Sequence, residues 1–210
     1  MKTIYVVITY TGTMLSKIIK MYTKSEFSHV SISMDLELQQ MYSFGRLNPY
    51  NPITGGFVHE YINKGTFKRF YKTKAKICAL QVTDEQYKNM KETISKIEKE
   101  KDNYTFNVLG LFAAGFHKKI GKERSFYCAE FVKYVIESSG VDLNLPDIIK
   151  PEDFKYVEEF ETIYTGLLRK YKPSKVNIKE LIRRNIITYT QKEGIIWKET
   201  KKLKFLKYFY

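Results

Sequence analysis

Two segments with different periodicities constrain the fold of this 210-residue chain more than any other feature. Residues 25–35 read SEFSHVSISMD, in which apolar residues alternate with His29 and serines, as in a half-buried β-strand. Residues 125–138 read SFYCAEFVKYVIES, in which apolar residues recur at helical spacing after Cys128. A strand with one polar face and a helix with one apolar face predict a sheet that packs against a helix.

The rest of the pattern predicts an α+β fold. A central antiparallel sheet is expected to pack on the Cys128 helix and on an apolar helix over residues 104–116. Turn signals with proline and asparagine predict a loop over residues 45–56. The other expected strands cover residues 4–9, 40–44, 57–62, 77–82 and 195–198, and the other expected helices cover 14–21, 83–101, 176–184 and a segment that begins at 151.

Positive charge is concentrated in the C-terminal part of the sequence. The chain has 36 Lys and Arg against 23 Asp and Glu, a net +13. Residues 166–210 hold 13 of the basic and 3 of the acidic residues, a net +10, which leaves a net +3 for residues 1–165. We therefore expect one domain over residues 1–165 and a basic accessory segment over 166–210. Such a segment suits an anionic membrane surface or another polyanion, but a solvated lysine-rich face gives the same pattern.

The cysteine content and the N-terminal residues bear on the compartment. Two cysteines are too few for a disulfide framework and are consistent with a reducing environment. Threonine interrupts the apolar run near the start, so residues 1–14 predict a first strand, and neither a signal peptide nor a membrane span. A cytoplasmic location is therefore expected. Cys78 alternates in register with Leu80 and Val82, as a core residue does.

Cys128 is placed differently, because it falls in the opening turn of a predicted helix. A thiol becomes a nucleophile when a basic partner and a positive site favour the thiolate, and an imidazole and a helix N-terminus supply both. His29 is the candidate base, since serines share its strand face. His59 shares its face with aromatic residues, and His117 begins a basic loop. The alternative is that Cys128 is a buried structural thiol.

No cofactor and no metal are expected. The two cysteines and three histidines never occur at close ligand spacing. A glycine-rich phosphate loop, a nucleophile elbow and a dinucleotide-binding fingerprint do not occur in the sequence either.

The segments FSHVSIS and FYCAEFV resemble the two motifs of the NlpC/P60-type papain-like hydrolases with circularly permuted topology, a group that includes YiiX-like proteins and the lecithin retinol acyltransferase group. The resemblance covers about residues 1–160, and the order His before Cys is typical of the permuted members. It implies a permuted papain-like fold over the first 165 residues. It further implies Cys128 as the nucleophile, His29 as the general base and backbone amides around Cys128 as the oxyanion hole.

The resemblance also implies a third polar group that orients the imidazole. The strand MYSFGR has no carboxylate near Ser43, where the family pattern would place one. Glu60 is the candidate in its place, because a carboxylate that alternates with apolar residues needs a partner. An ordinary salt bridge of Glu60 remains open, and Tyr42 or Ser43 would be the alternative orienting residue. Glu130 also matches the family pattern, although an acid in a first helical turn needs no further explanation.

The expected function is that of a cysteine peptidase, amidase or acyltransferase, a thiol hydrolase that acts on an amide or ester bond of a cell-wall peptide or a lipid-like substrate. One alternative is a catalytically inactive binding module of the same fold. Another is a membrane-surface or nucleic-acid-binding protein that acts through its basic tail, where KKLKFLKYFY combines lysines with aromatic residues. The oligomeric state and the substrate are left open.

Overall fold

The computed structural model describes residues 1–13, 16–17, 21, 25–107 and 123–176. The chain divides into two compact units, Met1–Pro173 and Ser174–Tyr210. The first unit is a mixed α+β fold whose main sheet is antiparallel, as the sequence predicts.

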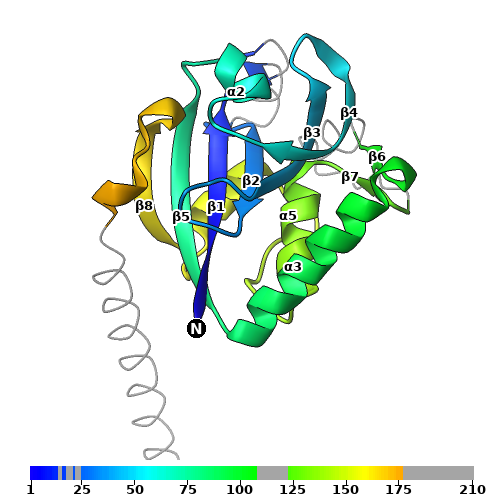
Figure 1. Cartoon of the computed structure of the whole chain (residues 1–210), viewed down its shortest axis with the longest axis vertical. Coiled ribbons are helices and arrows are strands. Elements are labelled where there is room, and N and C mark those ends of the chain that lie inside the picture. The colour runs from blue at the N-terminus through cyan, green and yellow to red at the C-terminus, as the bar shows by residue number, and fades with distance from the viewer. Residues whose placement is uncertain (14–15, 18–20, 22–24, 108–122, 177–210) are drawn as a thin grey trace, which may run out of the picture. The chain divides into compact units, whose positions relative to one another are not determined.

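Six strands form this sheet in the order β4-β3-β2-β1-β5-β8 (Figure 1). Each pair of neighbours is antiparallel, and β1 lies near the middle between β2 and β5. A separate pair of short parallel strands, β6 (Thr105–Phe106) and β7 (Ser125–Phe126), precedes the Cys128 helix. The bounds of the main strands are β1 Lys2–Tyr10, β2 His29–Ser33, β3 Met41–Asn48, β4 Asn51–Glu60, β5 Lys74–Val82 and β8 Glu161–Leu167.

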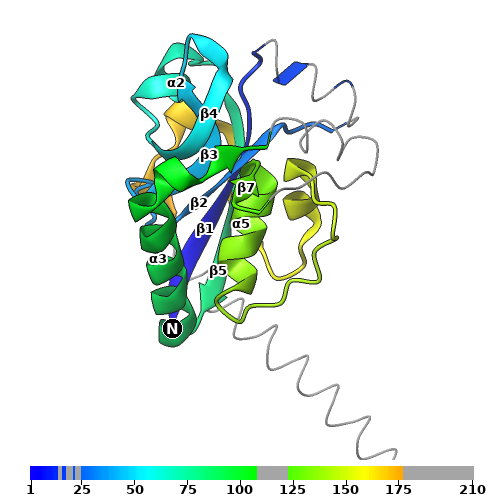
Figure 2. The ribbon, with the colours of Figure 1, turned by 90° about the vertical axis from the view of Figure 1, so that its right-hand side faces the viewer.

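Two helices pack on this sheet, α3 (Asp84–Lys99) and α5 (Cys128–Glu137), and Figures 1 and 2 show them next to each other. A capping box begins α3, because the Gln86 amide donates to Thr83 Oγ1 at 3.0 Å and the Thr83 amide donates to Gln86 Oε1 at 2.9 Å. The shorter helices are α2 (Gly65–Arg69) and the 3₁₀ turns η1 Lys101–Asn103, η2 Pro151–Tyr156, η3 Leu168–Lys170 and η4 Pro173–Lys175.

The core lies between the sheet and the two long helices. Alternate residues of β1 and β2 supply its sheet side, and the apolar stripe of α5 supplies its helix side. The other face of β2 carries His29 and two serines, so the alternation in the sequence correctly separates the two faces of the strand. The core residues of these three elements are Ile4, Val6, Ile8, Val30, Ile32, Ala129, Phe131, Val132, Val135 and Ile136.

The prediction of a loop over residues 45–56 is wrong. β3 and β4 continue through it as a hairpin, and only Pro49 and Tyr50 lie between them. Asn48 Oδ1 accepts the Tyr50 amide at 2.8 Å and forms the turn. Gly55 of this hairpin is a close-contact position, because a Cβ there would lie 2.3 Å from the Phe106 ring.

Three further differences concern the segments around the core. Residues 105–106, at the start of the expected helix over 104–116, form the strand β6, while residues 108–116 lie outside the described residues. β8 was not expected, and it continues across residue 166, where the sequence predicts the basic segment to begin. The segment that begins at 151 is a 3₁₀ helix. Most of the helix over 14–21, and all or nearly all of the expected elements over 176–184 and 195–198, lie outside the described residues.

Within the described part of the chain, no helix combines the length and apolar character needed to cross a membrane.

Candidate active site

Cys128 is the first residue of α5, and its side chain lines a cavity although the residue is only 2% exposed. Two contacts of the preceding residue fix the start of the helix. The Tyr127 amide donates to the Glu130 carboxylate at 3.1 Å, and the Tyr127 hydroxyl donates to the Ile149 carbonyl at 2.7 Å. Burial, and then the nearby Glu130, raise the pKa of Tyr127, so it remains a neutral donor.

The first turn of α5 also creates a positive electrostatic environment at its N-terminal end. The first N–H groups of an α-helix have no acceptor within the helix, and they point towards its N-terminal end. Cys128 and Ala129 contribute such amides beside the thiol. Together with the positive end of the helix dipole, they favour an anion at this position.

His29 is the first residue of β2 and lies opposite Thr9 of β1. Its Nε2 lies 3.1 Å and 3.2 Å from the two carboxylate oxygens of Glu60. Ser31 Oγ lies 3.4 Å from the same nitrogen. Cys128 lines the same cavity as His29, and it is one of the groups that raise the pKa of the imidazole. The Phe67 ring of α2, at 6.4 Å between centroids, packs near the imidazole and limits its contact with water.

Glu60 is the last residue of β4, and its carboxylate reaches His29 past the intervening strand β3. Gly45 of β3 leaves the necessary space, since a Cβ there would lie 3.3 Å from His29 Cε1 and 4.0 Å from Glu60 Oε1. Ser31 Oγ donates to Glu60 Oε2 at 2.5 Å. Ser31 therefore orients the Glu60 carboxylate, and the carboxylate in turn orients the His29 imidazole.

The charge state of His29 follows from its two neighbours. Burial lowers the pKa of the imidazole, but the Glu60 carboxylate and the hydrogen bond to Cys128 together outweigh burial and raise the pKa to about 10. The imidazolium is thus favoured at neutral pH. The cavity therefore holds a cation together with the Cys128 side chain at the N-terminus of α5.

The alternative orienting residues are engaged elsewhere. Ser43 Oγ donates to the Val30 carbonyl at 2.7 Å. The Tyr42 ring stacks on His59 at 4.6 Å. His59 itself bonds the Gln39 carbonyl at 2.6 Å, so it belongs to a separate cluster, and His117 lies outside the described residues.

Several residues of this cavity were not singled out in the sequence. Arg46 of β3 donates from Nη2 to Thr13 Oγ1 at 2.7 Å. Phe67 and Phe106 are the aromatic residues that line the cavity. No pattern in the sequence connects these residues, because they come from separate elements. The cavity has a volume of about 60 Å³, and its lining residues are Thr11, Thr13, Ser16, Ser28, His29, Gly45, Arg46, Glu60, Thr66, Phe67, Phe106 and Cys128.

Glu152 of η2 holds the segment that leads into β2. Its Oε2 accepts the Phe27 amide at 2.8 Å, two residues before His29. Lys155 donates to Glu152 Oε1 at 3.3 Å and to Glu26 at 2.9 Å. In the sequence, Glu152 indicated only the start of a helix, whereas its carboxylate fixes the backbone that positions the imidazole.

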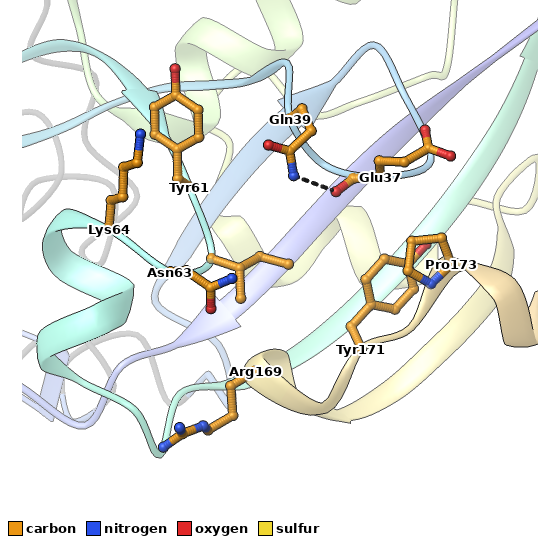
Figure 3. Close-up of a pocket in the computed structure, with 9 residues that line it drawn as sticks. Glu37, Gln39, Tyr61, Asn63, Lys64, Arg169, Tyr171 and Pro173 are labelled. Atoms are coloured by element: carbon orange, nitrogen blue, oxygen red, sulfur yellow. Dashed lines mark hydrogen bonds between the residues drawn. The ribbon is translucent and has the colours of Figure 1, made fainter.

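A second, larger pocket of about 450 Å³ shares no lining residue with the Cys128 cavity. Figure 3 shows its side chains, which come from the chain after β2, from the residues that follow β4 and from the residues that follow β8. It contains Glu37, Lys64, Arg169 and Tyr171, but neither cysteine nor histidine, so it offers no nucleophile and base for acyl transfer.

The described residues hold no group of three or more His, Cys, Asp or Glu side chains that would bind a metal ion. Comparisons with protein-family models, with curated proteins and with solved structures found no match.

Proposed function

We propose that this protein is a cysteine-dependent hydrolase or acyltransferase that acts on an amide or ester bond. The observation that carries the proposal is that Cys128, His29 and Glu60 line one cavity, where the thiol lies at a helix start and the imidazole contacts the carboxylate at 3.1 Å. Nucleophile, base and orienting group are the three parts that thiol acyl transfer requires.

In this mechanism His29 carries the proton in both half-reactions, the formation of the thioester and its breakdown. In the resting site the proton of Cys128 is already on His29, and the sulfur attacks the substrate carbonyl to form a tetrahedral oxyanion. The amides of Cys128 and Ala129 stabilise that oxyanion. His29 then donates its proton to the departing amine or alcohol, which leaves a thioester. Water, or another acceptor that loses a proton to His29, attacks the thioester and releases the acid or the transferred acyl product together with the free thiol.

We further propose that the fold is a circularly permuted papain-like fold of the NlpC/P60 type. The resemblance of the two motifs supports this assignment. So does the arrangement of an antiparallel sheet whose histidine strand precedes a cysteine helix in the chain. A cell-wall peptide or a lipid-like molecule with an acyl bond is the corresponding substrate class.

The inactive binding module is the less favoured alternative. Its main support in the sequence was the missing carboxylate near Ser43, and Glu60 supplies a carboxylate to His29 instead. A pure binding protein has no need for a carboxylate, an imidazole and a thiol in one cavity.

Turnover tests the proposal directly. The purified chain is assayed against libraries of peptides, acyl amides, esters and thioesters, with Cys128→Ala as the inactive variant and Cys78→Ala as the matched control. We expect product release from the wild type and from Cys78→Ala only. Turnover that survives in Cys128→Ala would remove the thiol from the mechanism, and a lack of turnover with every class would favour the binding module.

A membrane-surface role of the basic segment is a second candidate that does not exclude the first. Residues 166–210 carry a net charge of +10, and their last ten residues alternate lysines with aromatic and aliphatic residues. Such a segment binds anionic lipid through charge and apolar contact together.

A further inference from the structure

Arg46 places a positive charge in the cavity of the nucleophile. It lines this cavity together with Cys128 and His29. Among the described residues, the Arg46 guanidinium makes one hydrogen bond, from Nη2 to the neutral hydroxyl of Thr13. A guanidinium has five N–H donors, so most of its capacity is left for another partner.

No carboxylate neutralises this charge within the described residues, where none lies within ion-pair distance of Arg46. Glu60 is the acidic residue of the cavity, and its oxygens are used by His29 and Ser31. Burial, and then the like charge of Arg69, lower the pKa of Arg46, as expected for a cation without a counter-ion.

The neighbours of Arg46 hold the side chain in place and leave its charge uncompensated. Its guanidinium carbon lies 5.9 Å from the centre of the Phe70 ring, and Arg69 lies 5.4 Å from the same ring. A partly buried arginine that keeps an unpaired charge beside a nucleophile is unfavourable unless a ligand supplies the anion.

We propose that the substrate carries an anionic group, a carboxylate or a phosphate, that Arg46 binds next to the acyl bond attacked by Cys128. This inference rests on the proposed function and adds a substrate class to it. Arg46 would select and position the substrate through charge-assisted hydrogen bonds. Neutral amides and esters of the same shape would be poorer substrates.

Two alkylating agents of nearly equal size test the charge preference without knowledge of the substrate. Iodoacetate carries a carboxylate and iodoacetamide a neutral amide. In both, the sulfur of Cys128 forms a bond to the CH₂ carbon while the carbon–iodine bond breaks and iodide leaves. The measured quantity is the ratio of the two rates at Cys128, divided by the same ratio for a free thiol such as N-acetylcysteine.

The wild type should show a normalised ratio above that of the free thiol, and Arg46→Met should reduce it by at least about fivefold. Because the His29 imidazolium also attracts the anion, the difference between the two proteins isolates the share of Arg46. Arg46→Lys should retain part of the preference. Arg169→Met removes an exposed arginine from the other pocket and should leave the ratio unchanged.

Competition with the wild type covers the case in which Arg46→Met does not fold. Inorganic phosphate or acetate should slow alkylation by iodoacetate more than alkylation by iodoacetamide. Stronger competition by phosphate would assign a phosphate-bearing substrate, and competition by acetate at similar concentration would assign a carboxylate-bearing one.

Failure of this inference and failure of the proposed function give different results. Fast, His29-dependent alkylation with a ratio that Arg46→Met leaves unchanged would overturn the anion subsite and leave the enzyme intact. A ratio in the wild type equal to that of the free thiol, with no competition by either anion, would do the same. A Cys128 that neither reagent labels before unfolding would overturn both.

Discussion

The two cysteines of this protein are equally buried but lie in different surroundings. Cys78 is 1% exposed in the middle of β5, and Cys128 is 2% exposed at the start of α5. Burial raises the pKa of Cys78, whose nearest polar partner is the neutral hydroxyl of Thr162 at 3.9 Å. Cys128 instead lines a cavity together with His29 and Glu60. The partner and the position in the fold, more than exposure, distinguish a nucleophile from a core thiol.

The largest effect is expected when the base is removed. His29→Ala should slow alkylation of Cys128 at neutral pH by about 100-fold or more, because the thiol loses its proton acceptor and its neighbouring cation. Alkylation of Cys78, measured by mass spectrometry of the same samples, should not change. Equal rates at Cys128 in both proteins would show that the contact with His29 has no chemical consequence.

The orienting carboxylate should have the next largest effect. Glu60→Gln should reduce turnover, and alkylation of Cys128, by at least about tenfold, since a carboxylate fixes the imidazole and stabilises its charged form. Ser43→Ala is the matched control, because Ser43 contacts the Val30 carbonyl and not the imidazole. Similar small effects of both substitutions would remove Glu60 from the site.

The ion pair of His29 with Glu60 should also make the free energy of unfolding depend on pH. Because its folded pKa of about 10 lies above its unfolded pKa of about 6.5, the stability it contributes is complete below pH 6.5 and is lost as the pH rises through 10. Urea unfolding of the wild type and of His29→Gln should therefore differ more at pH 6 than at pH 10.5. A difference that does not depend on pH would contradict a charged imidazole in the folded protein.

Substitutions in the basic segment should have the smallest effect on the difference in alkylation rate between Cys128 and Cys78. Substitution of the four lysines in residues 201–210 by Gln should weaken binding to anionic vesicles at low salt but leave alkylation of both cysteines unchanged. The matched control substitutes four exposed lysines of α3, namely Lys88, Lys91, Lys96 and Lys99. If both variants bind vesicles as the wild type does, the segment has no role at membranes.

The sequence predicts the elements of this site better than it predicts their surroundings. Strong alternation in β2 and helical spacing in α5 identify His29 and Cys128, since both patterns are local. The choice of Glu60 rests on a carboxylate in an apolar alternation, and the structure places that carboxylate at His29. Each of these predictions depends on a few residues of one element.

What the sequence does not predict depends on contacts between elements. β8 is an edge strand with half-exposed residues and a glycine, so its alternation is weak. The hairpin of β3 and β4 contains glycines that usually mark loops, and here Gly45 and Gly55 make room for His29 and Phe106. Arg46 reaches the cavity from the same hairpin, so its place followed from no local pattern.

The central claim is that Cys128 is an activated nucleophile although it is as buried as Cys78. The most direct measurement is the rate of iodoacetamide labelling at each cysteine of the folded wild type near neutral pH, resolved by peptide mass spectrometry. We predict rapid modification of Cys128 and no modification of Cys78 until the protein is unfolded. Equal and slow modification of both cysteines, which becomes fast only in denaturant, would contradict the account.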